Sequence, residues 1–181
     1  MFCQKGKELF ATPCDTALFR SRKETALDGI RKDTFLRRKD REYLLDFVGN
    51  LPDDNTHCLH GDFQPGNLIL SEGTYYWIDL ARFAWGDPLF DVGHLYCVCN
   101  VFSRTKQARE VFHLTEEQLH TFWDAFAKAY TGHEDHTDFD REAARYAAAD
   151  IAMRSVYTNL RFVEKLFFRM LVRDTLKTAL K

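Results

Sequence analysis

The chain has 181 residues, of which 45% are hydrophobic and 29% charged, and its formal net charge is −2. This composition is typical of a folded globular domain and excludes a disordered chain. No apolar run approaches the roughly 20 residues that span a bilayer, and the first residues are too polar for a secretory signal. Five cysteines without a Cys-x-x-Cys pair argue against a disulfide framework. We therefore expect a cytoplasmic protein without a membrane partner.

Two helices are predicted ahead of residue 57, over residues 16–32 and 34–48, from the helical spacing of their apolar residues. The side chains expected to face the core are Leu36, Tyr43, Leu44 and Phe47. Basic residues cluster at 20–23 and 37–39, but no aromatic interleaving or recognition motif accompanies them. We interpret these clusters as solvated helix faces and expect no nucleic-acid partner.

The side chains best suited to phosphate and metal chemistry lie in two segments. These are His60-Gly61-Asp62-Phe63-Gln64-Pro65-Gly66-Asn67 and, after a short apolar run, Ile78-Asp79-Leu80. Between these segments, residues 68–70 and 75–78 are predicted to be short strands joined at residues 71–74. Such a hairpin folds the second loop back beside the first, so oxygens of Asp62, Asn67 and Asp79 would meet at one site. Asp62 would receive or orient the proton of an attacking hydroxyl, and Asn67 and Asp79 would supply hard oxygen ligands to Mg²⁺.

Helices dominate the rest of the chain. One is predicted from Pro88 to about residue 102, and another ends near residue 130 and begins at a capping box formed by Thr115 and Gln118. After a polar loop, residues 139–159 and 160–180 are also predicted to be helical. An apolar stripe at i, i+3 and i+4 spacing across these last two segments is interpreted as core. Its members are Val156, Leu160, Val163, Phe167 and Met170.

Three short motifs follow one another in the chain: His-Gly-Asp-x-x-x-x-Asn, then Ile-Asp, then Gly-Asp-Pro-x-x-Asp, which ends at Asp91. Their order resembles that of a family of kinase-like phosphotransferases, the aminoglycoside phosphotransferase and choline kinase group. The resemblance covers about residues 57–95. It implies a mostly α (α+β) fold, namely a kinase-like C-terminal lobe with a small hairpin at the catalytic loop. We expect a single lobe over residues 1–181, with catalytic and metal loops in 57–95 and a helical remainder in 100–181.

The resemblance also implies roles for five residues. Asp62 is the expected catalytic base, and Asn67 and Asp79 are the expected ligands of Mg²⁺ and, through it, of ATP. His60 and Asp91 are expected to support the loop structurally. The implied reaction transfers the γ-phosphoryl group of ATP to the hydroxyl of a small molecule.

A cationic acceptor is an open alternative, because relatives use acids of the later helical region to bind cations. The acids in question are Glu116, Glu117, Asp124, Glu134, Asp135, Asp138 and Asp140. A solvated charged surface is the preferred interpretation of these side chains.

Kinase-like enzymes hold the nucleotide with a Gly-rich loop and a strand lysine in a second lobe. Residues 1–59 contain only the isolated glycines Gly6, Gly29 and Gly49, and no Gly-x-Gly-x-x-Gly or Val-Ala-Ile-Lys pattern. We therefore expect an incomplete nucleotide site in a truncated chain, or in one that depends on a partner bearing the missing lobe or on self-association. The alternative function is a non-catalytic lobe that acts as a binding or interaction module.

Three residue patterns allow further interpretations. A zinc site is conceivable because imidazoles and thiols flank the hairpin, but their spacings match no common structural zinc pattern. These residues are His57, Cys58, His60, His94, Cys97 and Cys99. Arg82 is interpreted as the ion-pair partner of a carboxylate rather than as a phosphate contact. Gln64 stands where many members of the resembled family carry histidine.

Overall fold

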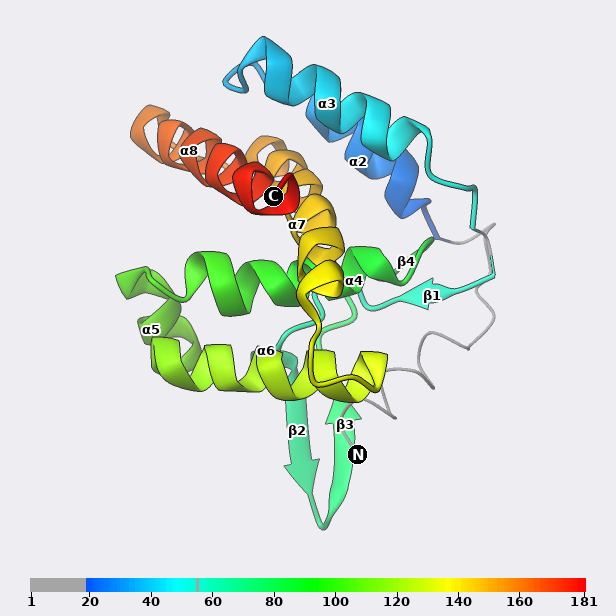
Figure 1. Cartoon of the computed structure of the whole chain (residues 1–181), viewed down its shortest axis with the longest axis vertical. Coiled ribbons are helices and arrows are strands. Elements are labelled where there is room, and N and C mark those ends of the chain that lie inside the picture. Colours follow the sequence, from blue (N-terminus) through cyan, green and yellow to red (C-terminus); the bar gives the residue numbers. More distant parts are fainter. Residues whose placement is uncertain (1–18, 55) are drawn as a thin grey trace.

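The computed structural model describes residues 19–54 and 56–181, and these are mostly helical (Figure 1). The helices are α2 (Arg22–Lys32), α3 (Arg38–Gly49), α4 (Leu89–Tyr96), α5 (Lys106–Phe112), α6 (Glu116–Thr131), α7 (Thr137–Tyr157) and α8 (Phe162–Ala179). Short strands form two antiparallel pairs, β1 (Cys58–Leu59) with β4 (Ala84–Trp85) and β2 (Leu68–Ser71) with β3 (Thr74–Trp77). The predicted fold class, a mostly α lobe with a small hairpin, is confirmed. None of the helices in these ranges is long and apolar enough to cross a membrane.

Helix α7 is the central element, and α2, α4 and α8 all pack against it (Figure 1). Its buried face is rich in alanine, and such small side chains let the neighbouring helices approach closely. Tyr146 fills the space that remains on this face. The rings of Phe47 and Phe90 each lie edge-to-face on Tyr146, with ring centroids 5.1 Å apart. The core of the lobe therefore forms around α7.

Helices α4 and α7 come closest at Gly93. A Cβ atom on Gly93 would lie 2.5 Å from the Cβ of Tyr146 and 2.8 Å from the backbone nitrogen of Ala147. We expect Gly93→Ala to lower the free energy of unfolding by about 1–3 kcal/mol, because the helices must separate to admit the methyl group. Urea denaturation measures this change. Gly49→Ala is the control, since nothing lies within 4 Å of its added Cβ; equal losses in the two variants would contradict the close approach.

The first two helices begin later than predicted. Residues 19–21 are not helical, because α2 begins at Arg22, where Ser21 Oγ accepts a hydrogen bond from the backbone nitrogen of Glu24 at 3.3 Å. Residues 16–18 lie outside the described residues. Helix α3 begins at Arg38 rather than at residue 34, because the Asp33 carboxylate binds the next backbone N–H groups in a local turn. A side-chain cap at Ser21 therefore sets the start of α2, whereas α3 follows the turn at Asp33 and its N-cap residue, Arg37, makes no side-chain cap hydrogen bond.

The two local motifs that the sequence predicted are confirmed. Strands β2 and β3 pair through a two-residue turn at Glu72 and Gly73, both with positive φ, as the tight turns of hairpins require. Thr115 and Gln118 form the predicted capping box of α6. The predicted helix from Pro88 is also present, as α4 followed by a π-helical stretch, η2 (Cys97–Phe102). Helix α5 was not predicted.

The predicted core side chains of α3 and its preceding turn lie as expected. Leu36 and Leu44 are buried, and Tyr43 and Phe47 pack against the core from partly buried positions. Each of these residues follows the helical spacing from which it was predicted.

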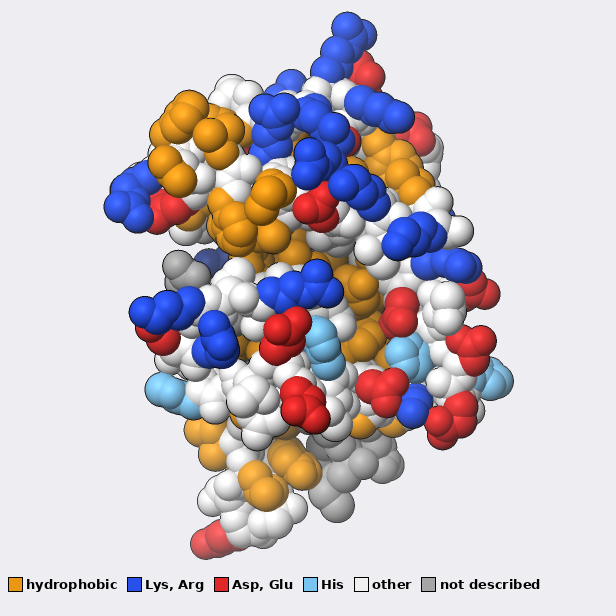
Figure 2. Space-filling model, turned by 60° about the vertical axis from the view of Figure 1, so that its left-hand side comes forward, with side chains coloured by type: hydrophobic (Ala, Val, Ile, Leu, Met, Phe, Trp, Pro, Cys, Tyr) orange, Lys and Arg blue, Asp and Glu red, His pale blue; other side chains and the backbone are white. Residues whose placement is uncertain are grey.

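The apolar stripe that was predicted to be core is not buried, and this prediction is wrong. Val163 is 74% exposed and Met170 is 44% exposed. The reason is the face of α8 that packs, because Val163, Phe167 and Met170 share one face of this helix and α8 turns the opposite face toward the core. Helix α8 instead buries Val172, Thr175, Leu176 and Ala179. Figure 2 shows hydrophobic side chains gathered at the surface and along the floor of a groove.

His136 joins α6 to α7. Its ring lies between two carboxylates, with Nε2 2.9 Å from Asp124 Oδ1 and Nδ1 2.9 Å from Asp140 Oδ1. Burial opposes the charged ring, but these hydrogen bonds outweigh it and raise the pKa of His136. A raised pKa stabilises the fold below the unfolded value of about 6.5, and this stabilisation is lost as pH rises through the folded value.

We therefore expect His136→Gln to cost about 0.5–1 kcal/mol of unfolding free energy at pH 5.5 and little at pH 9. Urea denaturation at both pH values measures the difference. His133→Gln, in the same loop but exposed, is the control. A cost for His136→Gln that is equal at both pH values would contradict the ion pairs.

Candidate functional site

The loop that carries Asp62 is held by a buried carboxylate in α4. Asp91 Oδ2 accepts a hydrogen bond from the backbone nitrogen of His60 at 2.6 Å, and its Oδ1 accepts one from Gly61 at 2.9 Å. Asp91 is 1% exposed, and this burial raises its pKa even though the charge of Arg22 and the two N–H groups oppose the rise. The backbone of the loop is therefore anchored to α4.

Only glycine fits at position 61. Its φ is +78°, and an added Cβ would lie 1.9 Å from the carbonyl oxygen of Arg82. The Arg22 guanidinium donates to that same carbonyl oxygen at 3.1 Å, so the loop and the segment after Asp79 are pressed together here. This contact fixes the backbone immediately before Asp62.

The hairpin returns the second loop to the first. The backbone nitrogen of Ile78 donates to the carbonyl oxygen of Asn67 at 3.0 Å, and the ring Nε2 of His60 lies 3.0 Å from the carbonyl oxygen of Ile78. The His60 ring is fully buried and packs edge-on against Trp77. His60 therefore links the two loops on either side of the hairpin, and Asp79 follows directly.

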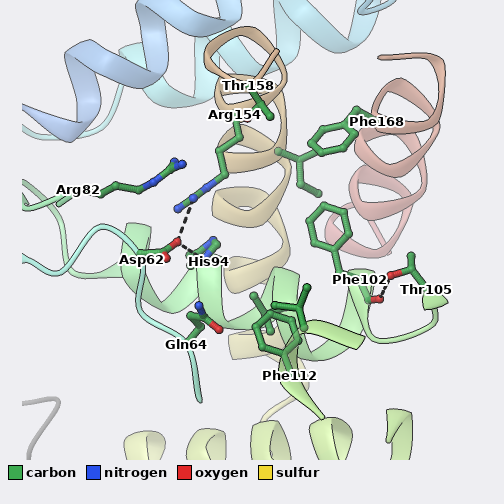
Figure 3. A pocket seen from close by; sticks show the side chains of 13 residues that line it. Asp62, Gln64, Arg82, His94, Phe102, Thr105, Phe112, Arg154, Thr158 and Phe168 are labelled. Carbon is green, nitrogen blue, oxygen red and sulfur yellow. Dashed lines mark hydrogen bonds and ion pairs between the residues drawn. The ribbon is translucent and has the colours of Figure 1, made fainter. Parts of the chain in front are cut away.

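Asp62 accepts hydrogen bonds on both of its oxygens. Oδ1 lies 3.1 Å from Nη1 of Arg154 and 3.1 Å from Nε2 of His94, as Figure 3 shows. Oδ2 accepts from Nδ2 of Asn67 at 3.1 Å. Burial by itself would raise the pKa of Asp62, but the hydrogen bonds and charges of these three partners outweigh it and hold the pKa well below its usual range. Asp62 is thus a carboxylate at neutral pH.

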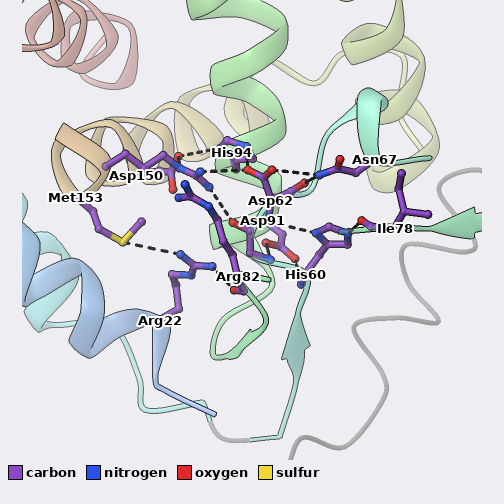
Figure 4. Close-up of polar contacts among 12 residues, drawn as sticks. Arg22, His60, Asp62, Asn67, Ile78, Arg82, Asp91, His94, Asp150 and Met153 are labelled. Atoms are coloured by element: carbon purple, nitrogen blue, oxygen red, sulfur yellow. Dashed lines mark hydrogen bonds and ion pairs between the residues drawn. The ribbon is translucent and has the colours of Figure 1, made fainter. Parts of the chain in front are cut away.

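Behind Asp62 lies a second acid, Asp150 of α7 (Figure 4). Its Oδ2 lies 2.9 Å from Nδ1 of His94 and 2.7 Å from Nε of Arg154. Arg154 also donates to the carbonyl oxygen of Gly61 at 2.8 Å. Burial would raise the pKa of Asp150, but the charges of Arg154 and His94 dominate and lower it. The imidazole of His94 is therefore held between two carboxylates, in one orientation.

Asp150 and Arg154 were not identified as site residues from the sequence. Asp150 and Arg154 stand at i and i+4 on one face of α7, and that spacing is the one signal they leave. Arg154 lies 92 positions from Asp62 along the chain. Such a contact is set by how α7 packs and not by any local pattern.

The structure brings Asn67 to Asp62 and places Asp79 on the neighbouring loop. Asn67 is buried, and its Nδ2 donates to the carbonyl oxygen of Asp62 at 2.9 Å as well as to the carboxylate, which leaves its amide oxygen for a cation. Asp79 is exposed and has a φ of +58°. Mg²⁺ is commonly bound by one or two protein oxygens together with water and phosphate. The donor set of Asn67 and Asp79 fits this ion.

Asp62 lines a cavity of about 280 Å³. Figure 3 shows its two sides, with Asp62, Arg82, His94 and Arg154 on one and aromatic side chains on the other. The apolar lining consists of Val98, Phe102, Val111, Phe112, Ile151 and Phe168. The carboxylate thus meets a space in which a small organic molecule fits.

Two further interpretations from the sequence, the ion pair of Arg82 and a zinc site, can be compared with the structure. Within the described ranges Arg82 makes no ion pair, so the predicted partner carboxylate is not found there. The thiols of Cys97 and Cys99 are buried, which raises the pKa of Cys99 to about 12 and that of Cys97 well above its usual value. No group of three or more His, Cys, Asp or Glu side chains in the described part of the chain is arranged to hold a metal ion.

Comparison with protein-family models gives one match. Residues 10–144 match the model described as the phosphotransferase enzyme family, which is more than half of the 181-residue chain. The match contains the loop of Asp62, the hairpin and α4. It ends within α7, ahead of Asp150 and Arg154.

Proposed function

Because the chain belongs to the phosphotransferase enzyme family, we propose that it transfers the γ-phosphoryl group of ATP to the hydroxyl of a small molecule. The observation that carries this proposal is the position of Asp62. Its carboxylate is ionised, is held on a loop anchored by Asp91, and lines a cavity of organic-ligand size. This combination suits a residue that orients an acceptor hydroxyl and receives its proton as transfer proceeds, since the lowered pKa keeps the carboxylate ionised but makes it a weak base.

In this proposal the side chains around Asp62 position it and leave room for the acceptor. A carboxylate offers about four lone-pair positions, and His94, Arg154 and Asn67 occupy three of them. The remaining position accepts a hydrogen bond from the acceptor hydroxyl and takes its proton as the new O–P bond forms. Asn67 and Asp79 would hold Mg²⁺, which when bound neutralises charge on the phosphates.

The nucleotide requires contacts beyond these loops. The described residues ahead of β1 are the helices α2 and α3, and they provide neither a Gly-rich loop nor a strand lysine. We propose that a nucleotide lobe on a partner chain, or on a longer form of this protein, supplies these contacts. The chain described here would then contribute the acceptor half and the metal half of the site.

A phosphoryl-transfer assay tests the proposal. The purified chain is incubated with Mg-ATP and a panel of hydroxyl compounds, alone and with a separately produced nucleotide lobe from another member of the family. We expect transfer that requires Mg²⁺ and stops when the ion is chelated. No transfer with or without the added lobe would sink the proposal.

An alternative function, a non-catalytic interaction module, is favoured by one observation. Large apolar side chains are exposed on the hairpin and the loop after it, beside Asp79; these are Ile69, Leu70, Tyr76, Ile78 and Leu80. Exposed apolar clusters of this kind commonly mark a binding surface. Self-association or capture of a nucleotide lobe in light-scattering experiments, without any phosphoryl transfer, would support this alternative. A monomer that binds Mg-ATP at micromolar concentration would argue against it.

A further inference from the structure

The cavity beside Asp62 also bears on the acceptor itself. Resting on the proposed function, we propose that the acceptor is a non-cationic hydroxyl compound with a compact apolar body. A cationic amino alcohol or an aminoglycoside is not the substrate that this cavity selects. Three features carry the proposal, namely the apolar wall, the charges at the cavity and an unpaired amide oxygen.

One side of the cavity is an apolar wall that comes from several elements. Phe102 ends η2, Phe112 ends α5 and Phe168 lies on α8, and Figure 3 shows all three rings facing the cavity opposite Asp62. The rings of Phe102 and Phe168 have centroids 5.7 Å apart. An apolar ligand surface of matching shape that covers this wall removes apolar area from water and so stabilises the complex. A polyhydroxylated or highly charged ligand leaves it uncovered.

The charges at the cavity oppose a cation. Asp62 is the one carboxylate among the lining residues, and His94, Arg154 and Asn67 occupy three of its roughly four lone-pair positions. Two guanidinium groups, those of Arg82 and Arg154, also line the cavity. A ligand ammonium would lose its hydration next to two positive charges, with no second carboxylate in the lining as compensation.

The acids that the sequence offered as a cation site lie elsewhere, and several of them have basic partners of their own. None of them lines this cavity. Asp124 and Glu134 both pair with Lys128 at 3.0 Å, and Asp138 pairs with Arg141 at 2.7 Å. Lys128 and Arg141 thus balance these negative charges within α6, α7 and the loop between them, away from the cavity.

Gln64 supplies a polar but uncharged contact point. Its Oε1 atom is buried and accepts no hydrogen bond from any described residue, while its side chain lines the cavity. A buried amide oxygen without a donor is unfavourable, so a rotation of the Gln64 side chain that brings Oε1 to an O–H of the ligand satisfies it without a charge. Asp62 and Gln64 together therefore recognise the hydroxyl end of the acceptor, and the aromatic wall recognises its body.

The volume of the cavity limits the size of the acceptor. At about 280 Å³ it is at the lower end of small-molecule pockets, which run from roughly 300 to 1,000 Å³. An acceptor with one ring or one branched chain fits within it, whereas an aminoglycoside of several rings would leave most of its surface outside.

A matched pair of ligands tests the proposal without any nucleotide. Phenylpropanol and phenylalaninol share a phenylpropyl skeleton with a terminal hydroxyl, and they differ only by the ammonium group of phenylalaninol. Calorimetry on the full chain at pH 7 should show phenylpropanol binding at least about tenfold more tightly than phenylalaninol, and kanamycin not binding. Tighter binding of phenylalaninol or of kanamycin overturns the inference, and so does the absence of phenylpropanol binding at millimolar concentration.

Adjacent residues of α8 give a matched pair of variants. Phe168 lines the cavity, whereas its neighbour Phe167 lines a different one. Phe168→Ala should weaken phenylpropanol binding about tenfold, and Phe167→Ala should leave it within about twofold. Equal effects of the two substitutions would place the ligand somewhere other than this cavity and contradict the inference.

Gln64→Glu tests the charge argument by adding a carboxylate to the lining. It should shift the preference toward phenylalaninol by about tenfold relative to the unaltered chain. An unchanged preference contradicts the role assigned to charge at this cavity.

Binding and turnover separate this inference from the proposed function. If phenylpropanol binds through Phe168 but no phosphoryl transfer occurs in any mixture with Mg-ATP, the ligand class stands and the proposed function fails. If transfer occurs preferentially to phenylalaninol, the proposed function stands and the ligand class fails.

Discussion

Replacing Asp62 with asparagine should lower the rate of phosphoryl transfer by about 10²- to 10⁴-fold, the usual loss when a general base is removed. Asparagine keeps the shape of the side chain but cannot take the proton of the acceptor hydroxyl. The carboxylate of Asp62 is ionised because His94, Arg154 and Asn67 hold its pKa below the usual range, against the effect of burial. The substitution therefore removes a charge that the site is built to maintain.

Single-turnover rates with Mg-ATP and an excess of acceptor measure this loss directly. Asp138→Asn is the control, because Asp138 is exposed on α7 and pairs only with nearby Arg141. Urea denaturation of both variants separates a catalytic loss from a folding defect. A rate for Asp62→Asn within threefold of the unaltered chain contradicts the assignment of Asp62 as the base.

Replacing Asp150 with alanine should lower the free energy of unfolding by about 3–5 kcal/mol, as expected when one partner of a buried ion pair is removed. Asp150 is 4% exposed and is hydrogen-bonded to both Arg154 and His94. Without Asp150, the Arg154 guanidinium stays buried with Asp62 as its remaining carboxylate partner. Urea denaturation at pH 7 measures the loss, and Asp138→Ala on the same helix should cost less than about 0.5 kcal/mol.

The stabilisation from Asp150 also has a predictable pH dependence. Its pKa is lower in the folded chain than in the unfolded one, so its contribution is complete above the unfolded value of about 3.9. That contribution is lost as pH falls through the folded value. The difference in stability between the unaltered chain and Asp150→Ala should thus be constant from pH 5 to pH 7 and shrink in stronger acid. A difference that grew in acid would show that Asp150 is not ionised in the folded chain.

The sequence predicts those parts of the fold in which the interacting residues are close neighbours. The turn at Glu72 and Gly73 and the capping box of Thr115 and Gln118 each join residues no more than three apart, so their residue types determine the geometry. The hairpin in turn predicts that the loop of Asp79 lies beside that of Asp62. These local rules account for most of the helices and for the two loops.

Local rules fail where the structure depends on packing between distant segments. The stripe that includes Val163 and Met170 follows helical spacing, but α8 packs its opposite face against the core and leaves those side chains exposed. Arg154 reaches Asp62, and Asp150 reaches His94, only because α7 packs against α4 and the loop. The apolar wall of the cavity likewise comes from η2, α5 and α8, which no single periodic pattern connects.

Arg154 contacts the catalytic loop but lies outside the part of the chain that the family model matches. It ties α7 to the loop through both Asp62 and the carbonyl oxygen of Gly61, yet it lies beyond residue 144, where the family match ends. A shorter chain that stopped at that boundary would keep Asp62, Asn67 and Asp79 and lose the guanidinium that holds the Asp62 carboxylate.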